Sequence, residues 1–224
     1  MGNDNSKQFM SGFQNKKVTH EFRTFFDFNK DGSLTEKDFV EAKEKICKMS
    51  GWKAGMPQYG HMETLFSEVW RNLHKSANED GDEEISEEEW CAMWDSLFEK
   101  MARDKELAEK EKREYQLELP DWLSRYFEYK FNLLDRTRDN EVDIEEYEYV
   151  MQDFGVKPKD ARDAFKRFTE GSSKKLDKAY FLQLCRQYFI SDDPEDPGNF
   201  INGKLEWDDL EVKYCPRVEE SKLC

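Results

Sequence analysis

Residues 27–38, DFNKDGSLTEKD, carry oxygen-bearing side chains at the first, third, fifth, seventh, ninth and twelfth positions. Asp27 and Asp31 would repel each other at this spacing unless a cation lay between them. Ca²⁺ takes about six to eight oxygen ligands, and a loop of about twelve residues supplies them at these positions. Gly32, at the sixth position, allows the positive φ that the turn requires. The segment therefore predicts a metal-binding loop with ligands Asp27, Asn29, Asp31, Ser33 and Asp38.

An acidic surface turn without an ion is the alternative, and the flanking residues argue against it. Apolar residues recur near helical spacing on both sides, as expected for two helices joined by a metal-binding loop. They are Phe22, Phe25, Phe26, Phe39, Ala42, Ile46 and Met49. The match to D-x-[DN]-x-[DN]-G-x₅-E fails only at Asp38, where the pattern has Glu. Because Asp is shorter and Mg²⁺ favours octahedral coordination, we expect Mg²⁺ to compete with Ca²⁺ in this loop.

The same spacing recurs at residues 78–89, NEDGDEEISEEE. Ile85 takes the eighth position, where Leu34 stands in the first copy and where two loops pair as short strands. In this register Glu83 is sixth, and positive φ there would cost a non-glycine residue about 1–2 kcal/mol. A rival register makes Gly81 sixth but puts Glu83 at the apolar strand position. We prefer the first register and expect a weakened site with ligands Asn78, Asp80, Asp82, Glu84 and Glu89.

A third copy, DRTRDNEVDIEE, occupies residues 135–146. Asn140 stands at the sixth position, where Asn tolerates positive φ better than most residues. Val142 is the apolar residue at the eighth position, and Asp143 adds an oxygen at the ninth. This copy predicts a third metal-binding loop with ligands Asp135, Thr137, Asp139, Glu141 (through its carbonyl) and Glu146.

A fourth copy, TEGSSKKLDKAY at residues 169–180, keeps the apolar anchor Leu176 but no carboxylate at the first, third, fifth or twelfth position. Lys174 and Lys175 add positive charge to it. We expect no cation there, and a structural role in which Leu176 pairs with Val142. The four copies together predict three bound ions and two pairs of loops.

Composition is consistent with a folded, acidic, cation-binding chain. The 224 residues carry a formal net charge of −15, yet 14% are aromatic, which is unlike acidic disordered chains. The acidic excess disfavours nucleic acid as a partner. Five cysteines, an odd number without a CxxC motif, indicate free thiols in a reducing compartment. With no run of 18 apolar residues and no signal-peptide core, we expect a cytoplasmic protein.

Helices on both sides of each loop predict two structural units. We expect the first pair of loops within residues 8–105, a helical linker at 106–119 and the second pair within 120–190. An N-terminal tail would cover residues 1–7 and a C-terminal tail residues 191–224. Four apolar residues of the second tail are expected to pack back onto the body: Phe200, Ile201, Leu205 and Trp207.

This arrangement resembles the sarcoplasmic calcium-binding protein and calexcitin family of the EF-hand superfamily. Three active loops, a degenerate fourth, Asp at the end of the first, and the long interval between the second and third carry the resemblance. The segments ISEEEWCAMW (85–94) and YFISDDPEDPGNFINGKLEW (188–207) are also similar to that family. The resemblance implies an all-α protein with two compact EF-hand pairs, short two-stranded loop pairings and a tail tucked between the pairs. It also implies Ca²⁺, with Mg²⁺ competing, in the cytosol.

The N-terminus, MGNDNSK, contains a separate signal. Gly2 followed by Ser6 fits the acceptor pattern for N-myristoylation. One myristoyl chain binds membranes only marginally and reversibly. A random polar terminus is the alternative. We expect at most weak membrane contact through Gly2, since Lys7, Lys16 and Lys17 form only a thin basic patch.

Three functions are compatible with these features, and none requires catalysis. The leading one is an intracellular calcium buffer that also modulates calcium signals. The second is a myristoylated calcium sensor that regulates a membrane or an unknown protein target. The third is a photoprotein or luciferin-binding protein, which shares this architecture. The degenerate fourth loop disfavours the third, because photoproteins usually need an active last loop.

Overall fold

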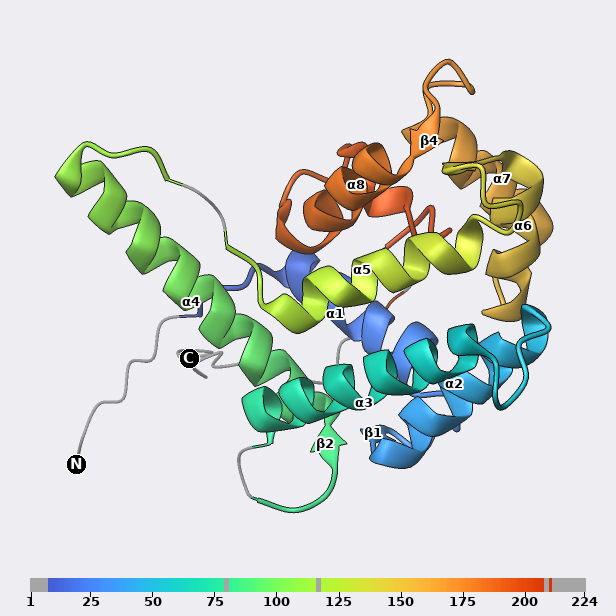
Figure 1. Cartoon of the computed structure of the whole chain (residues 1–224). Helices are drawn as coiled ribbons and strands as arrows, with labels where there is room; N and C mark the ends of the chain where they lie inside the picture. The colour runs from blue at the N-terminus through green and yellow to red at the C-terminus, as the bar shows by residue number, and fades with distance from the viewer. Residues whose placement is uncertain (1–7, 79–80, 116–117, 208–209, 211–224) are drawn as a thin grey trace, which may run out of the picture.

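The computed structural model describes residues 8–78, 81–115, 118–207 and 210 (Figure 1). Helices dominate it, which confirms the predicted all-α class. The elements of the first half are α1 (Gly12–Glu21), the π-helical η1 (Phe22–Phe26), β1 (Ser33–Leu34), α2 (Glu36–Met49), α3 (Pro57–Ala77), β2 (Ile85–Ser86) and α4 (Glu87–Glu111). Those of the second half are α5 (Asp121–Leu134), β3 (Glu141–Val142), α6 (Ile144–Asp153), α7 (Pro158–Phe168), β4 (Leu176–Asp177), α8 (Lys178–Ile190) and η2 (Pro197–Phe200).

The strands join the four loops into two pairs. β1 and β2 are antiparallel with Leu34 opposite Ile85, and β3 and β4 are antiparallel with Val142 opposite Leu176. Each partner is an eighth-position residue of its loop. The pairing confirms the four-copy alignment, including the degenerate copy, and it decides the register of the second copy in favour of Ile85.

The helix that leaves each of the first three loops starts with the same capping arrangement. Thr35, Ser86 and Asp143, at the ninth positions, are the N-caps of α2, α4 and α6. The twelfth-position carboxylates accept the N-cap backbone N–H groups, which satisfies donors that a helix start leaves open. The twelfth-position residue therefore has two roles: it caps the helix that follows the loop, and it is also a predicted metal ligand.

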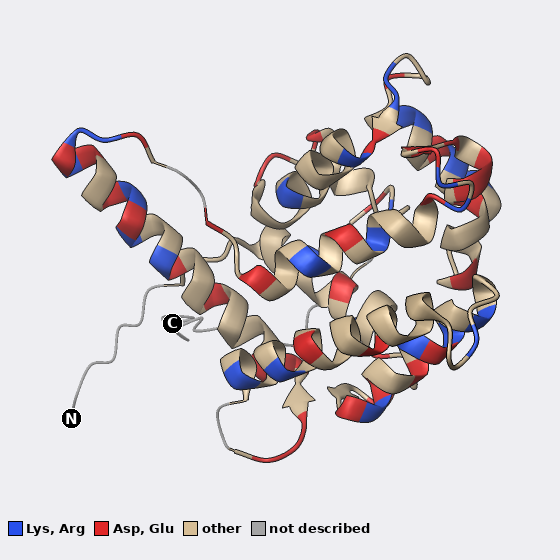
Figure 2. Cartoon of the chain, in the orientation of Figure 1, with Lys and Arg blue, Asp and Glu red and all other residues tan. Residues whose placement is uncertain are grey.

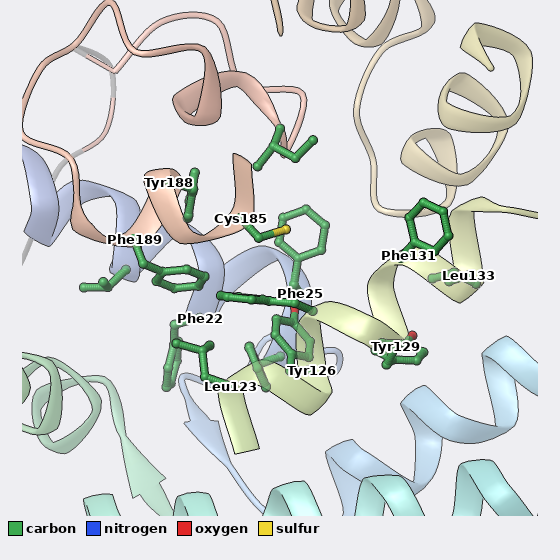
Figure 3. Close-up of a cluster of buried hydrophobic side chains, with 14 of the residues drawn as sticks. Phe22, Phe25, Leu123, Tyr126, Tyr129, Phe131, Leu133, Cys185, Tyr188 and Phe189 are labelled. Atoms are coloured by element: carbon green, nitrogen blue, oxygen red, sulfur yellow. The ribbon is translucent and has the colours of Figure 1, made fainter. Parts of the chain in front are cut away.

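The buried core is rich in aromatic side chains and is shared by both halves of the chain (Figure 3). Phe22 of η1, Tyr126 and Phe127 of α5, and Tyr188 and Phe189 of α8 are all buried. α5 contacts α3 of the first half as well as α6 and α8 of the second. The two halves therefore do not form independent cores.

The C-terminal segment after α8 packs back onto the body, as predicted. Phe200, Ile201 and Trp207 are buried, and Leu205 is partly buried against the core. η2 lies so close to α8 that a Cβ on Gly198 would be 2.6 Å from the carbonyl oxygen of Leu184. Only glycine permits this approach, because a contact that short excludes a side chain.

Lys17 of α1 also holds this segment; it is fully buried, so its place in the expected basic patch is wrong. The Lys17 ammonium donates to the Ser191 carbonyl at 2.6 Å and to Asn199 Oδ1 at 2.9 Å. Burial lowers the pKa of Lys17 to about 7, against the raising effect of Asp192 and Asp196. The segment is therefore anchored to α1 by polar bonds as well as by apolar packing.

α4 continues to Glu111 and projects from the body (Figure 1), so the first part of the expected helical linker is helical. From Arg113 to Pro120 the described residues are not helical, and α5 begins at Asp121. Acidic and basic residues alternate along the projecting end of α4 (Figure 2), including an ion pair between Glu106 and Lys110 at 2.7 Å. Among the helices that the structure describes, none is sufficiently long and apolar to span a membrane.

Candidate metal-binding loops

The first loop, residues 27–38, folds around the carboxylate of Asp27. Asp27 is buried, and its two oxygens accept the N–H groups of Asp31 at 3.2 Å and Gly32 at 3.1 Å. The carboxylate of Asp31 accepts the N–H of Ser33 at 3.0 Å. Positive φ occurs at the fourth position, Lys30 (61°), and at the sixth, Gly32 (91°). These bonds and the two left-handed residues turn the backbone of the loop around Asp27.

The end of the first loop contains a buried oxygen with no hydrogen-bond partner. Asp38 Oδ2 accepts the Thr35 N–H at 2.9 Å and the Thr35 hydroxyl at 2.8 Å. Asp38 Oδ1 has no hydrogen-bond partner, although Asp38 is only 1% exposed. Buried carboxylate oxygens without a donor are rare, and a bound cation is one explanation for them.

The third loop, residues 135–146, repeats this scheme with a different sequence. Asp135 accepts the N–H groups of Asp139 at 3.2 Å and Asn140 at 3.1 Å, and Asp139 accepts the N–H of Glu141 at 3.0 Å. Positive φ again occurs at the fourth and sixth positions, at Arg138 (61°) and Asn140 (65°), as expected for Asn.

The twelfth position of the third loop behaves differently from that of the first. Glu146 Oε2 accepts the Asp143 N–H at 3.2 Å, while Glu146 Oε1 reaches across the loop to the Thr137 N–H at 2.8 Å. The longer side chain therefore brings the third and twelfth positions together. In the first loop Asp38 instead accepts the N–H and the hydroxyl of Thr35, so its hydrogen bonds stay at the end of the loop.

The second loop keeps the scheme only in its second half. Glu84 donates its N–H to Asp82 Oδ1 at 2.8 Å, and Glu89 accepts the Ser86 N–H at 2.9 Å, as the corresponding residues of the first loop do. Asn78 Oδ1 instead accepts the N–H of Gly81 at 2.6 Å. Asp80, a predicted ligand, lies outside the described residues.

The expectation of positive φ at Glu83 is wrong. The described residues with positive φ include Gly81, at 82°, and do not include Glu83. Gly81 stands at the fourth position, where Lys30 and Arg138 have positive φ in the other loops. The loop therefore makes its fourth-position turn and omits the sixth, so no left-handed strain is placed on Glu83.

His74, near the end of α3, lies against this loop. His74 Nε2 is 3.1 Å from the Asp82 carbonyl oxygen and 2.8 Å from Asn78 Nδ2, and Asn78 Nδ2 also donates to the Asp82 carbonyl. These contacts turn the Asn78 amide nitrogen into the loop. The sequence offered one signal for this contact. His74 lies four residues before Asn78, and residues four apart are neighbours on a helix.

The fourth loop presents no carboxylate to its interior. Thr169 is buried and its hydroxyl donates to the Phe165 carbonyl at 2.6 Å. Lys175 reaches out of the loop to Glu141 of the third loop, with 2.6 Å between Nζ and Oε2. The degenerate loop therefore contacts its partner through an ion pair as well as through the strands, a contact that the sequence analysis did not anticipate.

The aspartates at the first and fifth positions of loop 1 have pKa shifts of opposite direction. Burial raises the pKa of Asp27, although N–H groups of Gly32, Lys30 and Asp31 oppose the rise. The Ser33 N–H lowers the pKa of the exposed Asp31. Among the described residues, no three Asp, Glu, His or Cys side chains are close enough together to hold an ion. The backbone of the loops is thus already turned by hydrogen bonds, while the side chains would have to move together to bind an ion.

Comparisons with known proteins agree with this geometry. No protein-family model matches the chain. The sarcoplasmic calcium-binding proteins I, III and IV of Branchiostoma lanceolatum are 26% identical over 195 residues, which cover 87% of this chain and 98% of the relative. Calexcitin-1 of Caenorhabditis elegans is 25% identical over 196 residues, covering 86% and 87%.

The solved structure of a sarcoplasmic calcium-binding protein from amphioxus superposes with a TM-score of 0.72 at 24% identity. It covers 88% of this chain and all of that one. This likeness confirms the fold of two EF-hand pairs. Sequence and structure together agree with the resemblance predicted above: the chain is similar to the sarcoplasmic calcium-binding proteins and to calexcitin over most of its length, and it has the fold of the first of these.

Proposed function

We propose that the chain binds Ca²⁺ through loops 1, 2 and 3, with Mg²⁺ competing, and acts in the cytoplasm as a calcium buffer that also modulates calcium signals. The observation that carries the proposal is the shared hydrogen-bond scheme of loops 1 and 3. Two different sequences, DFNKDGSLTEKD and DRTRDNEVDIEE, place the same carboxylate on the same backbone N–H groups. The sarcoplasmic relatives named above are described as calcium-binding, which supports the same ion.

The residues present fit a hard cation. Asp27 and Asp38 are buried carboxylates, and Asp38 Oδ1, which has no hydrogen-bond partner, would gain one. Bound Ca²⁺ would supply positive charge beside them and accept about six to eight oxygens. In loops 1 and 3 the first-position carboxylate orders the backbone by accepting N–H groups. The twelfth-position carboxylate then closes the loop.

Calorimetric titration of the ion-free protein, with and without millimolar Mg²⁺, tests this function. We expect three Ca²⁺ per chain, with Mg²⁺ weakening the binding at loop 1 most. Asp31→Ala and Asp139→Ala should each remove one ion, while Ser173→Ala in loop 4 should remove none. Four ions, or ion density beside Ser173, would contradict the stoichiometry, and no heat of binding would refute the function.

The sensor alternative depends on residues outside the described part of the chain, including Gly2. Protein made in a eukaryotic host should show one myristoyl chain by mass spectrometry, and Gly2→Ala should lack it. Hydrophobic-dye binding with and without Ca²⁺ then separates the functions. A buffer gives little change in dye fluorescence, whereas a sensor exposes an apolar groove.

The luciferin-binding alternative concerns the apolar cavity between the two halves. Phe25, Phe39, Phe66, Tyr129 and Phe154 are among the side chains that line it, and its volume is about 30 Å³. That volume holds about one water molecule. Adding coelenterazine and Ca²⁺ and measuring bound ligand and light tests this function directly. We propose ion binding without catalysis.

A further inference from the structure

A buried polar network joins three distant parts of the chain. Glu21 of α1 is fully buried, and its Oε1 accepts the Tyr126 hydroxyl at 2.7 Å and the Lys130 ammonium at 3.0 Å. Lys130 also donates to Asn202 Oδ1 at 2.8 Å, and Asn202 Nδ2 donates to Glu21 Oε2 at 2.5 Å. Lys130 is 7% exposed and Asn202 1%. Both oxygens of the carboxylate are therefore satisfied by groups from α5 and the C-terminal segment.

Each charged member lies just before a metal-binding loop. Glu21 is the last residue of α1, and η1 leads directly from it to Asp27, whose N–H donates to the Phe22 carbonyl at 2.9 Å. Lys130 lies in the last part of α5, where the N–H of Asp135 donates to Phe131 at 2.8 Å. Continuous backbone hydrogen bonds thus connect the network to the first ligand of loop 1 and to the first ligand of loop 3.

Aromatic contacts surround the same junction (Figure 3). The rings of Phe26 and Tyr126 are 4.7 Å apart between centroids, and the Lys130 ammonium lies 4.0 Å from the centroid of the Phe25 ring. The π-helical turn at η1 buries Phe22, Phe25 and Phe26 together against this region. A shift of η1 would therefore be transmitted to α5, because these side chains are buried and in direct contact with one another.

The pairing of the loops leaves loop 3 without an ion-binding partner. Its strand partner, loop 4, has no carboxylates in its first, third, fifth and twelfth positions. Strand pairing can couple ion binding in loop 1 to ion binding in loop 2. It cannot couple ion binding in loop 3 to that in another loop, because the strand partner of loop 3 is loop 4. A second route between ions would have to cross from one half of the chain to the other.

We propose that the Glu21–Tyr126–Lys130–Asn202 network couples ion binding in loop 1 to ion binding in loop 3, an inference that rests on the proposed function. Ordering loop 1 fixes η1 and Glu21, which hold Lys130 and the end of α5 in the position that loop 3 requires. Because coupling is reciprocal, an ion in loop 3 favours an ion in loop 1 by the same factor.

Site-specific titration of the full chain tests the coupling. Amide NMR of Asn140 reports loop 3 and amide NMR of Gly32 reports loop 1, since both N–H groups bond within their loops. Disabling loop 1 with Asp31→Ala should lower the Ca²⁺ affinity of loop 3 by about 5- to 150-fold. Disabling loop 3 with Asp139→Ala should lower the affinity of loop 1 by the same factor.

The network is removed by the paired change Glu21→Gln and Lys130→Met, which leaves no unpaired buried charge. In this background Asp31→Ala should leave the affinity of loop 3 within about twofold. The matched control, Glu128→Gln with Lys178→Met, removes an exposed ion pair of 3.2 Å between α5 and α8 and should keep the full loss. An equal loss in all backgrounds would overturn the proposal.

Hydrogen exchange supplies a readout that does not depend on the affinity of loop 3. In the Asp139→Ala protein, Ca²⁺ should slow exchange of the α5 amides near Leu134 even though loop 3 is disabled. The slowing should vanish in the paired network variant and persist in the control. Unchanged α5 exchange with Ca²⁺ bound at loop 1 would refute the coupling alone. Absence of Ca²⁺ binding at loop 1 in the unaltered chain would instead refute the proposed function.

Discussion

Loops 1 and 3 are the closest structural match within the molecule, and they differ at one informative position. In both, the first-position Asp accepts the N–H groups of the fifth and sixth residues. At the twelfth position Glu146 spans loop 3 to the Thr137 N–H, whereas Asp38 leaves Oδ1 without a partner. One methylene therefore determines whether a loop closes on itself without an ion.

The difference affects which ion each loop suits. Glu146 already reaches the third position, so it can supply both oxygens with little movement. Asp38 is shorter and is held by Thr35, so it is more suited to give one oxygen. Ca²⁺ accepts seven or more ligands and a bidentate carboxylate, while Mg²⁺ requires about six at shorter distances. We therefore expect loop 1 to favour Mg²⁺ more than loop 3 does.

The largest expected effect comes from the shared first position. Asp27→Ala and Asp135→Ala should each lower Ca²⁺ affinity at their own loop by more than about 100-fold, since even residues behind a ligand are worth about 10- to 100-fold. Calorimetry should show one ion fewer in each variant. If only one of the two variants loses an ion, the first-position Asp does not have the same role in loops 1 and 3.

A tenfold effect is expected at the twelfth position. Asp38→Glu should raise the Ca²⁺ affinity of loop 1 relative to Mg²⁺ by about tenfold, which corresponds to about 1.4 kcal/mol. Glu146→Asp should shift loop 3 in the opposite direction. Ca²⁺ titrations at several Mg²⁺ concentrations give both ratios. If both ratios stay unchanged, side-chain length is not what distinguishes the loops.

The features that local sequence determines were predictable. The strand residues depend on the pattern within one loop, and the eighth-position apolar residue indicated the register of loop 2, while the ligand assignments stay predictions. The packing of Phe200 and Ile201 followed from their apolar character in a polar tail. These predictions succeeded because the structure in each case depends on residues within one loop or on the burial of apolar side chains.

The features that were missed depend on contacts between distant residues. The sixth-position turn of loop 2 is absent, and Asn78 instead bonds to Gly81, a choice that the spacing of acids does not reveal. Glu21 and Lys130 are ordinary charges in the sequence, and only the fold buries them together. Buried ion pairs require specific geometry, which composition and periodicity do not encode.

Loop 2 extends the comparison to a loop that has only one of the two turns. Gly81→Ala should destabilise the protein by about 1–2 kcal/mol, because φ is 82° and the surrounding space is open, so only backbone conformation opposes the Cβ. Glu83→Gly should relieve no strain in this conformation. Thermal unfolding measures both changes. Gly60→Ala, at a helical position with equally open space, is the control and should not destabilise.

The smallest effect concerns the partner of loop 3. Lys175 of loop 4 pairs with Glu141, and that pairing raises the pKa of Lys175. Its positive charge lies beside loop 3, so Lys175→Gln should raise Ca²⁺ affinity there slightly. Lys175 is 78% exposed, and salt screens exposed charges within about 10 Å at 0.1 M. The gain should therefore be seen in titrations at low salt and disappear at high salt.

Lys37→Gln, which removes a similarly exposed cation of loop 1, is the matched comparison. A gain that persists at high salt would mean that loop 4 acts on loop 3 through the strand pairing rather than through charge.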